Sequence, residues 1–193
     1  MKRFLLILIG GILSGDVVAD MEPMTALSGN AVPLTLTMVV EQQTCDLTLI
    51  SPETVSFNPV IPSDLLGPSP GPVLRLPPKT ISLNLTNCGS SARSGAVPAI
   101  QVLGNNPFAG PAEVIFRDDG STADGVIGFG LRYQEQNGTA GAYLKNLDFV
   151  DLAGNGMAAQ DSIKNFLVDL YYGGGPVGAG SLQASLRFRF MYH

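Results

Sequence analysis

The sequence is poor in the residues from which catalytic and metal sites are usually built. Its 193 residues include no tryptophan, two cysteines and a single histidine. That histidine, His193, is the last residue, which makes it a poor base for a hydrolase triad. Two cysteines alone do not form a four-ligand zinc site. We therefore expect no enzymatic activity, no metal and no cofactor.

Basic residues are also scarce. The chain has 11 Lys and Arg against 16 Asp and Glu, a formal net charge of −5. Without a basic stripe to neutralise phosphates, we expect no nucleic-acid binding. Two aspartate clusters lie near glycines and match no calcium-binding loop: one contains Asp118, Asp119 and Asp124, and the other Asp148 and Asp151. We interpret both clusters as solvated turns between strands.

The longest apolar run lies at the N-terminus. Lys2 and Arg3 precede an apolar stretch over residues 4–13, and Ala19 stands just before a predicted cleavage point. These are the three parts of a secretory signal sequence. The stretch is shorter than the about 20 residues that a membrane-spanning helix needs. We expect residues 1–19 to be a signal peptide and the rest of the chain to be exported.

Export changes the interpretation of the two cysteines. Cys45 and Cys88 are an even number of thiols, and an oxidising compartment favours their pairing in one disulfide. The bridge would close a loop of about 44 residues. The loss of chain entropy in the unfolded state would then stabilise the fold by roughly 4 kcal/mol.

The remaining sequence favours short antiparallel strands. Glycine (23) and proline (14) separate runs in which apolar and polar residues alternate, the pattern of a half-buried strand. The Asn137-Gly138 pair predicts a tight turn. Seven prolines between residues 58 and 78 exclude a central strand, and we expect this segment to cross between sheets. The expected strands lie at residues 34–40, 80–86, 100–102, 129–133, 142–147, 166–172 and 182–192.

Both ends of the exported chain carry an alternating apolar strand. Residues 34–40 alternate near the start, and the last strand places six apolar side chains on one face. Those six are Leu182, Ala184, Leu186, Phe188, Phe190 and Tyr192. The two strands can pair within one molecule, or one of them can be offered to a neighbouring chain by strand addition.

Together these features resemble the pilin subunits of the chaperone–usher pathway, the type 1-like fimbriae. The spacing of Cys45 and Cys88 and the approach to Cys88 over residues 81–89 are typical of that family. So are a glycine 14 positions from the end, at Gly180, and a penultimate tyrosine, at Tyr192. The similarity runs through nearly the whole exported chain.

The resemblance implies an all-β fold, an incomplete immunoglobulin-like β-sandwich lacking its final strand. Residues 20–44 would be an N-terminal extension with a donor strand, and residues 45–193 the pilin domain. The donor side chains would be Val32, Leu34, Leu36 and Met38. The acceptor groove and the surface recognised by a chaperone would be formed by Gly180, Leu182, Ala184, Leu186, Phe188, Phe190 and Tyr192.

The implied function is that of a structural fimbrial subunit that polymerises by donor-strand exchange and contributes to bacterial adhesion. The expected partners are a periplasmic pilus chaperone, an outer-membrane usher, neighbouring pilin subunits and a host receptor reached through the fibre. The expected location is a fimbrium on the surface of a Gram-negative cell. Two positions depart from the family pattern, because Met38 stands where glycine is usual and Pro33 interrupts the donor strand.

Two other functions fit the same residues. One is a secreted carbohydrate-binding adhesin module closed by its own termini, although tryptophan, a frequent sugar-stacking residue, is absent. The other is a free-standing secreted sandwich that acts as an enzyme or an inhibitor. A closed domain of either kind would be a stable monomer, whereas a pilin domain would aggregate or copurify with a chaperone.

Overall fold

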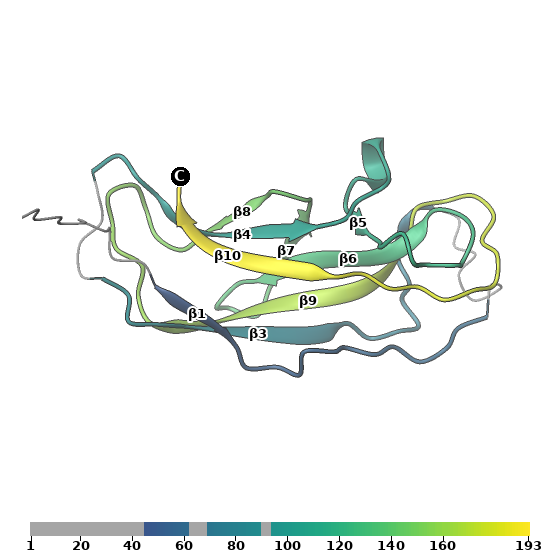
Figure 1. Cartoon of the computed structure of the whole chain (residues 1–193), viewed down its shortest axis with the longest axis horizontal. Coiled ribbons are helices and arrows are strands. Elements are labelled where there is room, and N and C mark those ends of the chain that lie inside the picture. The colour runs from purple at the N-terminus through teal and green to yellow at the C-terminus, as the bar shows by residue number, and fades with distance from the viewer. Residues whose placement is uncertain (1–44, 62–68, 90–93) are drawn as a thin grey trace, which may run out of the picture. The chain divides into compact units, whose positions relative to one another are not determined.

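A computed structural model describes residues 45–61, 69–89 and 94–193 of the chain (Figure 1). The predicted signal peptide (1–19) and N-terminal extension (20–44) lie outside the described residues, and so do all four predicted donor side chains. The strand expected at residues 34–40 therefore stays a prediction. Residues 42–193 form one compact unit, which we call the domain.

The domain consists of two antiparallel sheets that face one another (Figure 1). The larger sheet has the order β1-β3-β9-β6-β5, with β2 beside β9 and β7 beside β6. Its strands are β1 (Asp46–Leu49), β2 (Gly71–Pro72), β3 (Lys79–Thr86), β5 (Ile115–Phe116), β6 (Ile127–Gln134), β7 (Ala140–Leu144) and β9 (Ser162–Tyr172). The smaller sheet, in the order β10-β4-β8, contains β10 (Leu186–Tyr192), β4 (Pro98–Gly104) and β8 (Phe149–Asp151). The only helix in the described ranges is one short 3-10 turn, Gly110–Ala112.

Alternation along the strands builds the core between the sheets. In β9, Phe166, Val168 and Leu170 face inward with at most 5% of their surface exposed. From the smaller sheet, Ile100 and Val102 meet them and are fully buried. The expected all-β sandwich with a period-two pattern is confirmed.

The disulfide is confirmed. Cys45 lies directly before β1, and Cys88 lies two residues after β3. The bond therefore fastens the start of β1 to the end of its hydrogen-bonded neighbour within the larger sheet. Because 43 positions separate the two residues, the bond removes a large closed loop from the entropy of the unfolded chain.

Of two connections expected between strands, the structure confirms one and contradicts the other. The Asn137-Gly138 turn is confirmed, since Gly138 has a φ of 87° and donates its N–H to Glu135 O over 2.8 Å. The expected crossing of the proline-rich segment between sheets is wrong, because β1 before it, β2 inside it and β3 after it all belong to the same sheet. The short β2 pairs with Tyr171 and Tyr172 at the end of β9, beyond Val168, which pairs with the first residue of β3.

Candidate functional site: an open edge between β1 and β10

The last strand, β10, lies at the edge of the smaller sheet. One side of β10 pairs with β4 along its whole length, from Leu186 opposite Gly104 to Tyr192 opposite Pro98. Among the described residues, no strand pairs with the other side. The sequence thus ends in an edge strand with a long apolar face, an arrangement that invites pairing with another chain.

The direction of the backbone groups of β10 follows from the antiparallel ladder. Val97 and His193 exchange both of their N–H···O bonds, at 2.9 and 3.1 Å. Directly opposite pairs alternate between bonded and non-bonded, so residues 187, 189 and 191 also bond to β4. The N–H and C=O groups of Leu186, Phe188 and Phe190 therefore point away from β4, toward the open side.

The facing edge belongs to β1. Ile50 donates its N–H to Ser82 O over 2.9 Å, which makes residues 46 and 48 the members of β1 that bond to β3. The backbone groups of Leu47 and Leu49 consequently point to the side where no described strand lies. Two strand edges, each with main-chain groups that no described strand pairs with, thus flank the same space.

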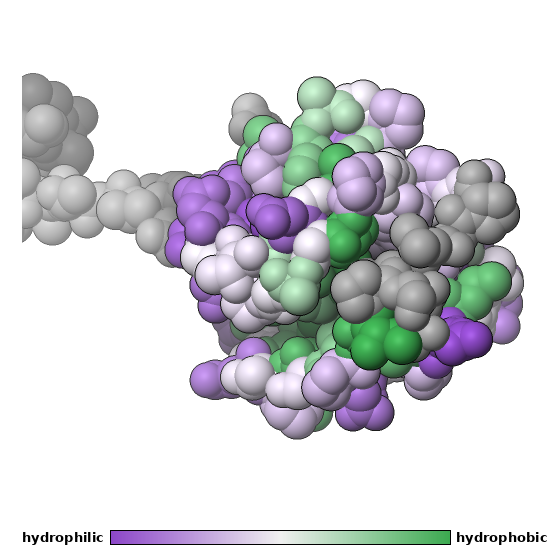
Figure 2. Space-filling view, turned by 90° about the vertical axis from the view of Figure 1, so that its right-hand side faces the viewer, coloured by the Kyte–Doolittle hydropathy of each residue, from purple (hydrophilic) through white to green (hydrophobic). Residues whose placement is uncertain are grey.

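Apolar side chains line the space between these edges. Leu186, Phe188 and Phe190 point inward and pack on the core, yet each is only half-buried, whereas Ile100 and Val102 on the neighbouring strand are fully buried. The ring of Phe188 lies 4.9 Å from that of Phe166, measured between centroids. Figure 2, which views the domain from one end, shows hydrophobic residues inside a hollow between an upper and a lower layer.

The opposite wall comes from β1 and the segment after it. Leu49 pairs with the buried Leu83 and shares its inward direction, but 43% of Leu49 is exposed. Leu47 and Phe57 also pack against the core while remaining partly exposed, and Phe57 contacts Phe129 with ring centroids 5.5 Å apart. These three residues were not among the sequence-predicted site residues. The Leu47–Leu49 alternation directly after Cys45 was the signal that would have identified two of them.

The predicted final strand is shorter than expected because residues 181–185 bond to a loop instead of to β4. Asp118 and Thr122 donate their N–H groups to Gln183 O and Ser181 O, over 2.8 and 2.9 Å. Leu182 packs on a second, smaller group of buried residues, which includes Ile127 and Tyr172. Ala184 packs on the main cluster, so the apolar face of β10 continues through both residues.

Gly180 occupies a close approach between two backbones. A Cβ atom there would lie 2.4 Å from Ala123 N and 2.5 Å from the carbonyl carbon of Thr122. The glycine therefore positions the segment that leads into β10. This gives a physical reason for the glycine at this place in the sequence.

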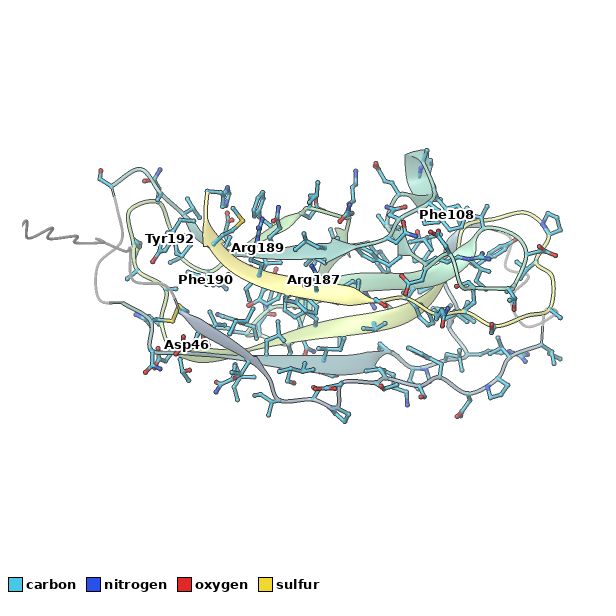
Figure 3. The ribbon with its side chains drawn as sticks, viewed as in Figure 1. Asp46, Phe108, Arg187, Arg189, Phe190 and Tyr192 are labelled. Carbon is cyan, nitrogen blue, oxygen red and sulfur yellow. A yellow bond between two sulfur atoms is a disulfide. The ribbon has the colours of Figure 1, made fainter. Side chains whose placement is uncertain are left out.

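The C-terminal end of β10 is fixed by a cluster of side chains. The His193 ring stacks on Phe149 with centroids 4.3 Å apart, and its Nε2 lies 2.9 Å from Asp151 Oδ1. Tyr192 meets Phe190 edge to face, with centroids 5.4 Å apart. Figure 3 places Phe190 and Tyr192 at the same end of the domain as Asp46. The disulfide and the end of β10 thus mark one end of the open edge.

Two arginines lie on the outer face of β10. Arg187 and Arg189 are exposed and alternate with the inward-facing apolar residues. Arg189 donates to Gln101 Oε1 over 2.6 Å, which holds its guanidinium close to the smaller sheet. The open edge is therefore apolar inside and positively charged on its outer side.

One inward-facing position of β9 carries a lysine. Lys164 pairs with Leu83 in the row that ends at Leu49, and only 7% of its surface is exposed. Burial lowers the pKa of Lys164, because desolvation disfavours the charged ammonium. No hydrogen bond or ion pair joins it to another described residue. Its position two residues before Phe166 places a charge beside the core.

A separate buried ion pair lies on the opposite face of β9. Asp169 is 4% exposed and accepts hydrogen bonds from Arg132 Nε at 2.9 Å and from Tyr143 OH at 3.0 Å. Burial, and next the charge of Asp169, raise the pKa of Tyr143. Every member of this cluster has a partner, so we assign it a structural role.

The predicted turn aspartates have local partners. Asp118 accepts a hydrogen bond from Ser185 Oγ at 2.7 Å, and Asp148 accepts one from Lys145 N at 2.7 Å. Across residues 45–61, 69–89 and 94–193, no group of three or more His, Cys, Asp or Glu side chains is placed to hold a metal ion. No helix within the same ranges is long and apolar enough to cross a membrane.

Comparison with known proteins gives a likeness in structure and none in sequence. No protein-family model matches the sequence, and no curated protein matches it. Among solved structures, the chain is similar to the CupB6 tip adhesin from Pseudomonas aeruginosa, with a TM-score of 0.44 and 14% identity. The match covers 79% of this chain and 46% of that one, so this chain spans less than half of the adhesin structure.

Proposed function

We propose that this chain is a structural subunit of a chaperone–usher fimbria that polymerises by donor-strand exchange and contributes to bacterial adhesion. The observation that carries the proposal is the open side of β10. There, three residues direct at the same space both their half-buried apolar side chains and backbone groups that no described strand pairs with. They are Leu186, Phe188 and Phe190.

A strand inserted between β10 and β1 would satisfy both edges. Its main chain would bond to the two ladders, and its alternate side chains would fill the space beside Leu49 and Phe188. Each Leu or Phe side chain removed from water in this way contributes about 1.5–3 kcal/mol. An empty domain with such an edge is prone to aggregation, which is the physical reason why a periplasmic chaperone would have to cover it before assembly.

The remaining partners and the location follow from the same proposal. An outer-membrane usher would exchange the chaperone for the extension of the next subunit, and the fibre would extend from the cell surface. The alternative of a carbohydrate-binding module closed by its own termini requires β10 to have a strand on both sides. The second strand would have to come from residues outside the described ranges, because only β4 among the described strands pairs with β10.

Two charge substitutions on adjacent residues test the proposal. In the bacterium that encodes the chain, Phe188→Glu places a carboxylate inside the groove, whereas Arg187→Glu places one on the outer face. We expect electron microscopy to show surface fibres containing the Arg187→Glu chain and none containing Phe188→Glu. Export of both variants to the periplasm is the control, measured by immunoblot. Fibres that incorporate Phe188→Glu as well as the native chain would refute the proposal.

A further inference from the structure

β10 crosses the core in the direction opposite to β9. Leu182, shortly before β10, packs on the buried group that contains Tyr172, the last residue of β9. Six residues after Leu182, the ring of Phe188 lies 4.9 Å from that of Phe166, measured between centroids. Phe166 is in turn six residues before Tyr172. Equal steps forward along β10 and back along β9 therefore bring inward-facing residues of the two strands opposite one another.

One further inward step places Lys164 of β9 opposite Phe190 of β10, which Figure 3 shows near Asp46. Within the larger sheet, Lys164 pairs with Leu83, and Leu83 pairs with Leu49 on the open edge. At about 4.8 Å between neighbouring strands, this edge lies about 10 Å from Lys164. Lys164 thus belongs to the floor of the groove, the space between β10 and β1, at the end beside the disulfide.

Among the described residues, Lys164 has no counter-charge. It is 7% exposed, and no hydrogen bond or ion pair joins it to another described residue. The inward-facing residues beside it, Leu83 and Phe166, are apolar. Burial alone lowers the pKa of Lys164, without a contribution from an acid. The nearest acid along the chain, Asp161, is exposed and accepts a hydrogen bond from Cys88 N over 3.0 Å. Buried charges in proteins are usually paired, so this lysine needs an explanation.

A strand that fills the groove changes the surroundings of Lys164. It removes more water from the floor of the groove and so raises the cost of the ammonium charge. A wholly apolar strand leaves that charge unpaired. A carboxylate on an inward-facing side chain supplies the missing partner, and the flexible four-carbon stem of lysine allows the ammonium to reach it. The strand that matches this groove is therefore apolar except for one acidic side chain at the disulfide end.

The chain's own predicted donor segment does not meet this requirement. Residues 32–40 contain no charged residue. Glu41 follows them directly, but it alternates out of phase with the four predicted donor side chains, so it would face outward in the same strand. The requirement for an inward-facing acid thus points to a strand from a different protein.

We propose that Lys164 determines which strand the groove accepts, by pairing with a carboxylate on the inward face of that strand. This inference rests on the proposed function and adds a specificity-determining residue to it. The partner is a different protein chain whose inserted strand carries one Asp or Glu among alternating apolar residues. Strands without the acid are disfavoured because they leave a buried charge unpaired. Lys164 therefore costs stability in the open domain and selects one class of partner.

A glutamate scan of a model strand tests the pairing. The acceptor is the exported chain carrying Leu34→Glu and Leu36→Glu, so that no copy can donate its own extension. The probes are peptides of residues 30–42 in which one alternate position at a time carries glutamate, and a matched series carries glutamine, which has nearly the same shape and no charge. The scanned positions are Val32, Leu34, Leu36, Met38 and Val40. Fluorescence anisotropy measures each affinity for this acceptor and for the same acceptor with Lys164→Met or Lys164→Gln.

We expect one position at which the glutamate peptide binds at least tenfold more tightly than its glutamine match. Lys164→Met and Lys164→Gln should both abolish this preference while the acceptor stays folded, as measured by circular dichroism. The preference should persist in 1 M salt, because a buried pair is screened far less than the attraction of an acidic peptide to the exposed Arg187 and Arg189.

Two results would overturn the role of Lys164 and leave the strand-accepting groove in place. In the first, the peptides bind, but glutamate is no better than glutamine at any of the five positions. In the second, a preference for glutamate survives both Lys164 substitutions. If no peptide binds, the native sequence included, the proposed function is itself overturned.

Discussion

Phe188→Ala should cost more stability when the groove is filled than when it is open. A fully enclosed Phe→Ala change costs about 3–5 kcal/mol, through lost transfer energy and the cavity that remains. With the groove open, Phe188 is only half-buried, and the exposed part of its ring has no neighbours to lose. We therefore expect about 2–3 kcal/mol for the open chain. The added cost in the filled state is about 1–2 kcal/mol, within the range of coupling between contacting residues.

The assay is urea unfolding of the Leu34→Glu/Leu36→Glu chain, hereafter the donor-deficient chain, with and without a saturating peptide of residues 30–42 of the native sequence. Val102→Ala is the matched control, because Val102 lies directly opposite Phe188 on β4 and is fully buried in either state. Its cost should be equal with and without peptide. The expected difference for Phe188→Ala corresponds to about 5- to 30-fold weaker peptide binding. An equal cost for Phe188→Ala in both states would refute the reasoning, as would a difference of the same size for Val102→Ala.

Three further predictions concern the stability of the domain, measured by urea or thermal unfolding. Lys164→Met should stabilise the domain by about 1–3 kcal/mol at pH 7, since it removes a buried charge that has no hydrogen-bond or ion-pair partner among the described residues. The pKa of Lys164 is lowered in the folded state, so the unfolded unsubstituted chain binds more protons than the folded one, and its stability rises with pH. The stability gained by Lys164→Met should therefore shrink as the pH approaches about 10.4. A gain that does not change with pH would contradict this. Replacing both Cys45 and Cys88 by serine should cost roughly 2–4 kcal/mol, and an unchanged melting temperature would be inconsistent with the loop-entropy account. Gly180→Ala should cost about 1–3 kcal/mol through its clash with backbone, whereas Gly71→Ala, with open space around its Cβ, should cost under about 1 kcal/mol; equal costs would exclude the close approach as the cause.

Regular alternation made much of the fold predictable. Residues 80–86 and 166–172 follow a strict period of two, and both occur as strands that pair with each other. The disulfide was predictable because an oxidising compartment, which the predicted signal peptide implies, favours pairing of the only two cysteines in the sequence. The start of β10 was not predictable, because residues 181–185 keep the same alternation but bond to the loop that contains Asp118 and Thr122.

Of the two walls beside the open edge, the sequence predicts only the one formed by β10. The apolar face of β10 is visible in the sequence, whereas Leu49 resembles any strand residue until its register opposite Leu83 reveals an inward, exposed side chain. The inward position of Lys164 could also have been predicted, because its spacing from Phe166 and Val168 places it on the inward face of β9. The close approach of Gly180 to Thr122 and Ala123 joins segments that are distant in the sequence, and no local pattern reveals it.

The most direct test of the open edge is amide hydrogen exchange along β10 in the donor-deficient chain. In the absence of peptide, we predict slow exchange at Arg187, Arg189 and Met191, whose N–H groups bond to β4, and fast exchange at Leu186, Phe188 and Phe190. The native peptide of residues 30–42 should then slow the second set. Slow exchange at all six amides without peptide would mean that the edge is already covered, and the strand-accepting groove would have to be abandoned.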